Sequence, residues 1–201
     1  MSKLLLVRHG DTEANSAERY WGCSDVRLSA SGIRQAERLR QRLSDEKIDA
    51  VYSSNLSRAL VTAQTIASEH QLEVIACPEL SEIDFGKFEG LSFAEVRQLY
   101  PEVAKLWAER NPSLEFPGGE SLDGFGKRVS QFLNRLEKRS SEGTILVVAH
   151  SGSLRVLVCR LLGIGLQHRW HFRLDLASLS ILDTYPQGAI LALLNDVSHL
   201  R

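Results

Sequence analysis

The sequence predicts an α/β fold, a three-layer α/β/α sandwich around a mostly parallel central sheet. Strand-like apolar segments alternate along the chain with segments of helical periodicity, which is typical of this class. Two of the strand-like runs, residues 4–7 and 144–149, are apolar at almost every position, as expected for strands buried on both faces. No repeat, low-complexity tract or linker interrupts the chain. We therefore expect a single domain spanning residues 1–201.

The individual elements follow from the same patterns. Strands are predicted over residues 4–7, 49–53, 73–76, 144–149, 177–185 and 189–195. Helices are predicted over residues 33–43, 56–67, 93–99, 103–107 and 122–136, with a last one opening at Ser153 or Leu154. Ser29 or Ser31 can cap the first helix. The turn at residues 186–188 predicts a hairpin of the last two strands at the sheet edge.

The composition of the chain argues against several classes of protein. Its 201 residues include 24 basic and 25 acidic side chains, for a net charge of -1, so neither a nucleic-acid partner nor a membrane surface is expected. The three cysteines are far apart and odd in number, which favours a reducing, cytoplasmic location over a disulfide framework or a zinc site. No leader peptide and no membrane helix of ~20 apolar residues is expected. A homodimer is compatible with the sequence, which does not fix the oligomeric state.

Polar side chains follow the two strongly apolar strands. Arg8 and His9 come directly after the first run, and His150 comes directly after the other. Because open α/β sheets bind ligands at the carboxyl ends of their strands, these positions predict a site. Arg58 is expected in the first turn of a helix, whose free amides attract anions, and Glu82 on a glycine-rich loop. If the two strands are neighbours, these five side chains could meet in one pocket.

These residue types suit chemistry on a phosphoryl group. Guanidinium forks match phosphate oxygens and keep their charge. A neutral imidazole can attack phosphorus to give a covalent phosphohistidine, while a second imidazole donates to the phosphoryl oxygens in the transition state. A carboxylic acid can protonate the leaving alkoxide and then act as base on water. Trp21, Phe85 and Trp107 are more often core residues than parts of a substrate wall, and among them Trp21, in the polar loop after the first strand, is the best candidate for a wall.

Ordinary structural roles compete with this interpretation. A single histidine at a strand end is often only hydrogen-bonded, so His150 gains its significance from the matching context of His9. Asp84 and Glu89 lie close to Glu82 in the sequence, and either carboxylate could take its place.

Five motifs, in this order, resemble the signature of the histidine phosphatase superfamily, which has the phosphoglycerate mutase-like fold. They are LVRHGDTEAN at residues 6–15, Gly22 with Asp25 and Leu28-Ser29, SSNLSRA at residues 53–59, Glu82 with Gly86, and VAHSG at residues 148–152. The resemblance spans nearly the whole chain. One departure is Asp11, where Glu is commoner in the family.

The resemblance implies a role for each matched residue. His9 is expected to be the phosphorylated nucleophile and Glu82 the proton donor, with His150 completing the catalytic set. The residues expected to bind the substrate are Arg8, Asn15, Gly22, Arg58 and Ser151. The family needs no metal and no other cofactor.

The residues after Glu82 resemble the phosphatase branch rather than the mutases, which are longer and carry a basic, tyrosine-containing stretch there. PGGES at residues 117–121 and WHFRLD at residues 170–175 are similar to α-ribazole-5′-phosphate phosphatases of cobalamin nucleotide-loop assembly. We therefore expect a metal-independent phosphomonoesterase for a small-molecule phosphate ester, with α-ribazole 5′-phosphate as the first candidate. The alternatives are a broad-specificity acid-type phosphatase, a phosphoserine or sugar-phosphate phosphatase and, behind them, a phosphoglycerate mutase.

Two further classes stay open as alternatives. A metal hydrolase could use His9, His150 and carboxylates as ligands, but the flanking arginines would repel the cation. A module that binds phosphorylated ligands without turnover could use the same pocket, although the presence of both histidines and of Glu82 counts against it.

Overall fold

The computed structural model of the chain describes residues 2–14, 19–138 and 143–201. Within them lies a six-stranded sheet in the order β3-β2-β4-β1-β5-β6. The strands are β1 (Ser2–Arg8), β2 (Ala50–Ser53), β3 (Val74–Ala76), β4 (Gly143–Ala149), β5 (Leu179–Tyr185) and β6 (Gly188–Asp196). The first four pair in parallel, while β5 and β6 add antiparallel to β1 and to each other. The predicted mostly parallel sheet, with a hairpin at its edge, is confirmed.

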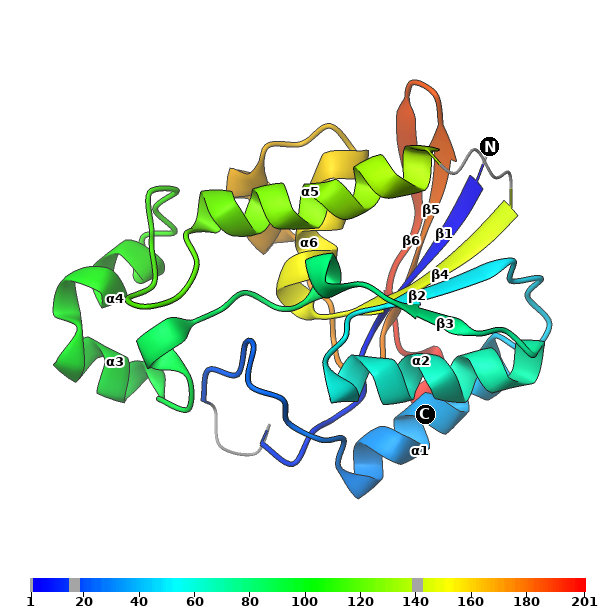
Figure 1. The fold of residues 1–201 in the computed structure, drawn as a ribbon, viewed down its shortest axis with the longest axis horizontal. Helices are drawn as coiled ribbons and strands as arrows, with labels where there is room; N and C mark the ends of the chain where they lie inside the picture. The colour runs from blue at the N-terminus through cyan, green and yellow to red at the C-terminus, as the bar shows by residue number, and fades with distance from the viewer. Residues whose placement is uncertain (1, 15–18, 139–142) are drawn as a thin grey trace.

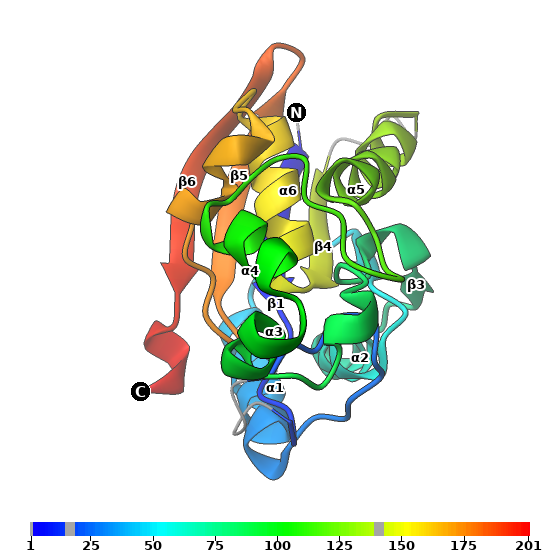
Figure 2. The ribbon, with the colours of Figure 1, turned by 90° about the vertical axis from the view of Figure 1, so that its left-hand side faces the viewer.

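Helices cover both faces of the sheet, as the predicted sandwich requires (Figure 1, Figure 2). One face carries α1 (Ala30–Arg42) and α2 (Ser57–His70), and the other carries α5 (Leu122–Lys138) and α6 (Ser151–Leu161). Two short helices, α3 (Phe93–Leu99) and α4 (Pro101–Ala108), stand beyond the end of the sheet at which β1 and β4 terminate (Figure 1). The described 3-10 turns are η2 (Pro78–Leu80), η3 (Gly86–Phe88), η4 (Leu166–His171) and η5 (Ser198–Leu200).

The core is divided between the two faces of the sheet. Successive side chains of a strand point to opposite faces, so in β1 Leu4 and Leu6 pack toward α5 and α6 while Leu5 and Val7 pack toward α1 and α2. All four side chains are at least 96% buried. The continuous apolar run therefore reflects burial on both sides of a central strand.

The start of α1 is tied to the turn that follows β1. Ser29 is the N-cap, and its hydroxyl accepts the N–H of Gly32 at 3.0 Å and donates to the Asp11 carboxylate at 2.7 Å. Gly10 and Gly32 let the two backbones touch, since a Cβ on Gly10 would lie 2.6 Å from the Gly32 carbonyl oxygen. Asp11, the one departure in the first motif, thus fixes the turn next to the site.

The start of α6 differs from the prediction. The helix begins at Ser151 instead of Ser153 or Leu154, because His150 itself is the extended N-cap residue (φ -119°, ψ 166°). The Ser153 hydroxyl accepts the backbone N–H of His150 at 3.2 Å. The sequence prediction, Ser153 or Leu154, therefore placed the start at least two residues too late.

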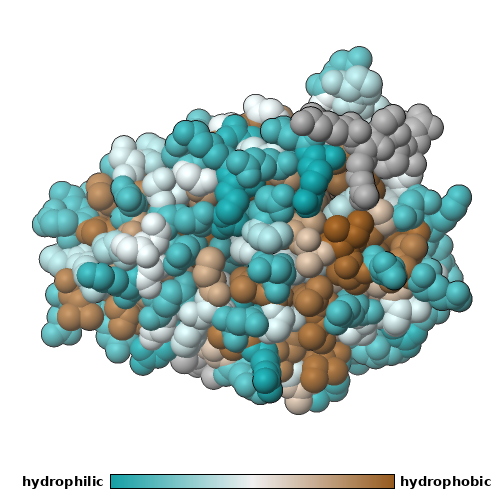
Figure 3. All heavy atoms as spheres, viewed as in Figure 1, coloured by the Kyte–Doolittle hydropathy of each residue, from teal (hydrophilic) through white to brown (hydrophobic). Residues whose placement is uncertain are grey.

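The surface is mixed in character. On the face seen in Figure 3, polar side chains predominate, and apolar side chains gather on the side of α2 and β3; Val61 of α2 and Ile75 of β3 are among the exposed apolar residues. Among the described residues, no helix is long and apolar enough to cross a membrane.

We expect Leu146→Ala in β4 to lower the free energy of unfolding by about 3 kcal/mol, because it leaves a cavity between two packed layers. Leu146 is completely buried in the core that α1 and α2 share with the sheet. Leu99→Ala, at a side chain that is 59% exposed, is the matched control and should cost less than about 0.5 kcal/mol. Urea denaturation measures both, and similar losses for the two variants would contradict the assignment of the core.

Candidate active site

The pairing of β1 with β4 brings the two histidines together. The strands are parallel neighbours, and Arg8 is the register partner of Ala149. His9 and His150 are the next residues along each strand, so they leave the same edge of the sheet side by side. Their ring centroids are 5.0 Å apart, which is close to the spacing of adjacent strands. The condition for a shared pocket, that the two strands are neighbours, is met.

A pocket of about 50 Å³ lies at this edge. It is lined by Arg8, His9, Thr12, Trp21, Val26, Arg58, Glu82 and His150. The five side chains that were expected to meet if the two strands are neighbours therefore lie in one pocket, and Trp21 forms part of its wall. Its volume suits a phosphoryl-sized group and leaves the remainder of a larger molecule outside.

His9 is held as a neutral ring of one tautomer. Its Nδ1 lies 2.7 Å from the carbonyl oxygen of Gly10, and because a carbonyl only accepts, Nδ1 carries the proton and Nε2 the lone pair. Burial lowers the pKa of His9 well below its ordinary value, and the charges of Arg8 and Arg58 lower it further. At neutral pH the ring is thus uncharged, and Nε2 is free to act as a nucleophile.

His150 is oriented by a serine at the end of the neighbouring strand. Its Nε2 lies 2.8 Å from the hydroxyl of Ser54, which already accepts the N–H of Leu56 at 3.2 Å and so can direct its proton to Nε2. This arrangement leaves Nδ1–H of His150 as a donor. Burial lowers the pKa of His150 well below its ordinary value, with further lowering by His9 and the nearby arginines. The start of α6 adds positive potential at the same place.

Both arginines are anchored by backbone carbonyls. Arg8 donates from Nη1 to the carbonyl of Leu174 at 2.7 Å. Arg58, in the first turn of α2 and 3% exposed, donates to the carbonyls of Ser24 and Gly22 at 2.8 and 2.6 Å. Each guanidinium has further N–H groups beyond these bonds. The anchors therefore aim the two cations while leaving donors for a bound anion.

Three buried nitrogens of pocket residues have no hydrogen-bond partner in the described part of the chain. They are Nε of Arg8, Nδ1 of His150 and Nε1 of Trp21. A buried donor without a partner costs about 1–3 kcal/mol, so such groups indicate a ligand that accepts hydrogen bonds. Two guanidinium cations beside them make an anion with several oxygens the matching ligand.

Glu82 is fixed by backbone amides on both of its carboxyl oxygens. Oε1 accepts the N–H of Ile83 at 3.0 Å and Oε2 accepts the N–H of Gly152 at 2.9 Å. The side chain is 9% exposed and lines the pocket. A Cβ on Gly152 would lie 2.1 Å from Oε1 of Glu82, so a larger residue there would displace the carboxyl group. The carboxyl group is thereby tied to the start of α6, next to His150.

The two competing carboxylates have other tasks. Glu89 accepts the backbone N–H groups of Gly22 and Cys23 at 2.9 and 3.1 Å. Asp84 accepts the N–H of Gly86 at 2.8 Å. Neither lines the pocket in the described structure, so Glu82 is the carboxylate that belongs to it.

Comparison with known proteins identifies the family of this chain. A family model described as the histidine phosphatase superfamily (branch 1) matches residues 4–197. The chain belongs to the histidine phosphatase superfamily. With this family and relatives that include named phosphatases, the protein is a phosphatase enzyme, and both the predicted family and the predicted fold class are confirmed.

Named relatives match this histidine phosphatase over nearly its full length. Phosphoserine phosphatase 1 of Hydrogenobacter thermophilus is 41% identical over 200 residues, which cover 100% of this chain and 95% of the relative. The adenosylcobalamin/alpha-ribazole phosphatase of Escherichia coli is 36% identical over 194 residues, 96% of each chain. The solved structure of the alpha-ribazole phosphatase from Shigella flexneri has a TM-score of 0.91 at 36% identity and covers 96% of each chain.

The other residues predicted to bind substrate are placed differently. Gly22 is not among the residues that line the pocket of the histidine phosphatase; its carbonyl accepts from Arg58, and a Cβ there would lie 1.9 Å from the Ile83 carbonyl oxygen. Ser151 is the first residue of α6 and also lies outside the lining. Asn15 lies outside the described residues.

Sequence reasoning missed several residues of the site. Thr12 and Val26 line the pocket, and Ser54 orients His150. Ser54 follows β2 directly, and β2 is the parallel neighbour of β4. The strand-end rule that singled out the two histidines could therefore have found Ser54, whereas nothing in the sequence distinguishes Val26.

We expect acid to destabilise the fold through the two buried imidazoles. Above pH 6.5, the ordinary histidine pKa, both rings are neutral in the folded and in the unfolded state. Below pH 6.5 the unfolded chain binds protons on these rings, whereas the folded chain does not, because its two histidine pKa values are lowered. The free energy of unfolding therefore falls as the pH falls toward the lowered folded-state pKa. Between pH 7.5 and 5.5, His9→Asn should lose roughly 1 kcal/mol less unfolding free energy than the parent. Urea denaturation at both values tests this. The exposed His168 gives the control, His168→Asn, and an equal benefit from the control would contradict the assignment.

Proposed function

We propose that this histidine phosphatase hydrolyses phosphate monoesters through a covalent phosphohistidine on His9. The observation that carries the proposal is the neutral His9 ring, whose Nδ1 bonds to the Gly10 carbonyl while two guanidinium groups stand beside it. A cationic nucleophile would have no lone pair to offer, and an uncharged pocket would not hold a phosphate dianion. In this pocket His9 carries the lone pair, while Arg8 and Arg58 carry the positive charge.

The first step transfers the phosphoryl group to the enzyme. Nε2 of His9 attacks phosphorus as the bond from phosphorus to the ester oxygen breaks. Protonated Glu82 gives its proton to that oxygen, so the alcohol leaves neutral and Glu82 becomes a carboxylate. Arg8, Arg58 and His150 donate to the non-bridging oxygens, over which the charge is spread in the transition state.

The second step releases phosphate. Water attacks phosphorus, and the Glu82 carboxylate takes one of its protons. The bond between phosphorus and Nε2 breaks, its electron pair returns to His9, and inorganic phosphate leaves. Glu82 is protonated again, so the cycle needs the ester and water and no further reactant.

The charges of the pocket suit an anion without a metal ion. Arg8 and Arg58 provide the positive charge that a metal would otherwise supply. Within the described residues, no group of three or more His, Cys, Asp and Glu side chains could hold a metal ion. We therefore propose that activity is independent of divalent cations.

We expect His9→Ala to lower turnover of a phosphate ester by roughly 10³-fold or more, since no other ring offers its lone pair to phosphorus. The parent protein, quenched with denaturant during turnover of a radiolabelled ester, should carry label that mild acid removes and alkali does not, as a phosphohistidine does; His9→Ala should carry none. His168→Ala is the control and should be labelled normally.

Three results would contradict this prediction. Near-parental activity of His9→Ala would remove the nucleophile assignment. Binding of phosphorylated ligands without turnover in the parent would favour a binding module, and loss of activity in excess chelator would favour a metal hydrolase.

We propose α-ribazole 5′-phosphate as the substrate, with phosphoserine as the second candidate. The first rests on the relatives from Escherichia coli and Shigella flexneri and on Trp21, whose indole in the pocket wall suits contact with a flat, apolar benzimidazole. The second rests on the relative from Hydrogenobacter thermophilus.

The PGGES and WHFRLD segments, which resemble α-ribazole-5′-phosphate phosphatases, support residues around the pocket. Glu120 of PGGES bonds to the N–H of Asp84, and the carbonyls of Leu174 and Phe172 in WHFRLD accept from Arg8 and Arg155. Both segments therefore hold residues near the pocket. We expect the residues of the pocket wall to select the substrate.

A substrate panel tests this choice. We expect kcat/KM for α-ribazole 5′-phosphate to exceed that for phosphoserine, sugar phosphates and 3-phosphoglycerate by at least about tenfold, and Trp21→Ala to reduce the ratio. A phosphoserine preference that survives Trp21→Ala would overturn the first candidate in favour of the second. Similar values for all esters would indicate a broad-specificity phosphatase.

A further inference from the structure

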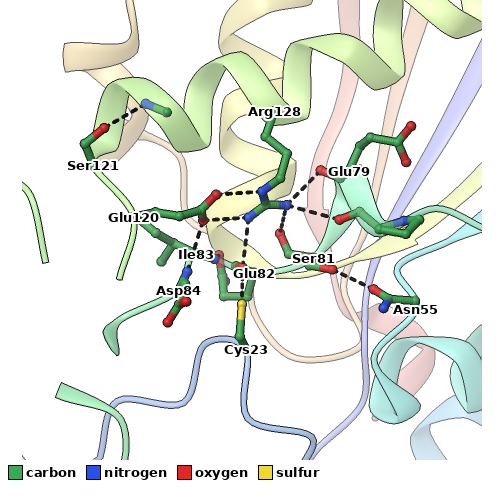
Figure 4. A network of polar contacts seen from close by, with 12 residues as sticks. Cys23, Asn55, Glu79, Ser81, Glu82, Ile83, Asp84, Glu120, Ser121 and Arg128 are labelled. Atoms are coloured by element: carbon green, nitrogen blue, oxygen red, sulfur yellow. Dashed lines mark hydrogen bonds and ion pairs between the residues drawn. The ribbon is translucent and has the colours of Figure 1, made fainter. Parts of the chain in front are cut away.

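A single side chain of α5 gathers the backbone that carries Glu82. Arg128 donates through Nη1 to the carbonyls of Pro78, Glu79 and Ser81 at 3.2, 3.1 and 3.1 Å, with one of the two Nη1 hydrogens shared between two carbonyls. Through Nη2 it donates to the carbonyl of Glu82 at 3.1 Å. Figure 4 shows the guanidinium at the centre of this group. Four carbonyls of one short segment thus bond to one cation. In a regular strand or helix such carbonyls would bond to backbone N–H groups instead.

The counter-ion of Arg128 holds the same segment from its other side. Glu120 accepts two parallel bonds from Arg128, each of 2.8 Å, and its Oε2 also accepts the N–H of Asp84 at 3.1 Å (Figure 4). The backbone N–H of Glu120 bonds to the Asp84 carbonyl at 3.0 Å. Glu82 is therefore bracketed, with its preceding backbone fixed by the cation and its following backbone fixed by the anion.

The pair is well suited to act as one charged unit. Both side chains are about three-quarters buried, at 23% and 24% exposed. Burial raises the pKa of Glu120, but the bonds from Arg128 and from the Asp84 amide outweigh it and leave the pKa below its ordinary value. Burial likewise lowers the pKa of Arg128, and the bonds to Glu120 reverse this shift. A lysine has three donors and no planar fork, so it cannot reproduce both the bidentate pair and the fan of carbonyl bonds.

We propose that the Arg128–Glu120 pair is the positioning device of the catalytic acid, setting where the Glu82 carboxyl meets the leaving oxygen. This inference rests on the proposed function, which makes Glu82 the proton donor. The hydrogen bonds of Arg128 in the described structure go to Glu120 and to backbone carbonyls, among them that of Glu82, and not to Arg8, Arg58 or His150. Loss of Arg128 should therefore weaken protonation of the leaving group and spare phosphate binding by Arg8 and Arg58.

Leaving groups of different basicity test this role. We choose kcat/KM for two esters of similar shape, because this constant reports the steps up to departure of the first product. The phenolate leaving from 2,4-dinitrophenyl phosphate needs no proton, whereas the one leaving from phenyl phosphate is basic and does. Glu82→Gln sets the benchmark: we expect a loss of about 10²-fold or more for phenyl phosphate and a loss below about fivefold for the dinitrophenyl ester.

Arg128→Gln should also lower kcat/KM more for phenyl phosphate than for the dinitrophenyl ester, but by smaller factors than Glu82→Gln. We expect a loss of about tenfold for phenyl phosphate and less than about threefold for the dinitrophenyl ester, since a small misplacement of an acid weakens proton transfer. Arg128→Lys should lie between the parent and Arg128→Gln. Inhibition by inorganic phosphate should stay within about twofold of the parent, because the phosphate-binding donors are unchanged.

Arg135→Gln is the matched control. Arg135 lies on the same helix, donates to Sγ of Cys77 at 2.6 Å and pairs with the Glu79 carboxylate at 3.2 Å, so it also holds this segment, but at side chains and farther from Glu82. Its loss should change both esters equally and by less than about twofold.

The outcomes distinguish a positioning role of Arg128 from a structural role and from failure of the proposed function. Equal slowing of both esters in Arg128→Gln would overturn the positioning role and leave a structural one. If Glu82→Gln shows no difference between the two esters while His9→Ala is inactive, the acid lies elsewhere and this inference is wrong, although the phosphohistidine mechanism stands. If His9→Ala is active, the proposed function itself has failed. Should Arg128→Gln not fold, as judged by circular dichroism, Arg128→Lys and Glu120→Gln must show the difference between the two esters for the proposal to hold.

Discussion

The parallel register of β1 and β4 is the constraint on which the rest of the site depends. It sets Arg8 opposite Ala149, and so places His9 and His150 side by side with ring centroids 5.0 Å apart. A shift of one residue in either strand would turn one ring to the opposite face of the sheet, because strand side chains alternate. The apolar residues of both strands resist such a shift, since they are buried on both faces. Core packing therefore fixes the distance between the two rings.

Backbone carbonyls, more than carboxylates, hold the arginines around the pocket. Arg8 bonds to the carbonyl of Leu174, and Arg58 bonds to those of Gly22 and Ser24. A carbonyl orients a guanidinium without neutralising it, so the positive charge stays available for an anion. The exception is Arg128, which has Glu120 as a counter-ion and lies outside the pocket lining. The structure thus separates cations that face the ligand from a cation that supports the loop.

The histidines show why burial and charge have to be considered together. Burial removes water from both rings and lowers the pKa of each, and the neighbouring guanidinium groups act in the same direction. Burying the imidazole and guanidinium groups lowers the stability of the fold. The same burial and charge keep the His9 ring neutral, so that it can act as a nucleophile in a cationic pocket. The buried donors of Arg8, His150 and Trp21 that lack partners in the described structure belong to the same balance, because a bound anion would satisfy them.

How much the sequence revealed depended on whether the signal was local. The strands and the first helix are local patterns of polarity and side-chain chemistry, and they were predicted closely; of the two serines proposed as its cap, Ser29 is the N-cap. The start of α6 was missed by two residues, because the N-cap is the histidine itself. The family resemblance singled out Glu82, whereas the residues alone left Asp84 and Glu89 as alternatives, since their roles depend on which backbone amides the fold brings to each carboxylate.

The sequence by itself determined the two strand-end histidines, the arginine at the start of α2 and the ordered motifs that indicate the family. Their chemistry is carried by residue type and by position relative to a local pattern. Only the tertiary structure decided the tautomer of His9, the role of Ser54 and the network around Arg128. The role of Ser54 and the network around Arg128 depend on atoms that meet across 96 and 46 residues, and hydrogen bonds between distant segments leave no period or spacing in the sequence. The tautomer of His9 is set by the carbonyl of the next residue, Gly10, but only the folded turn after β1 brings this carbonyl to Nδ1.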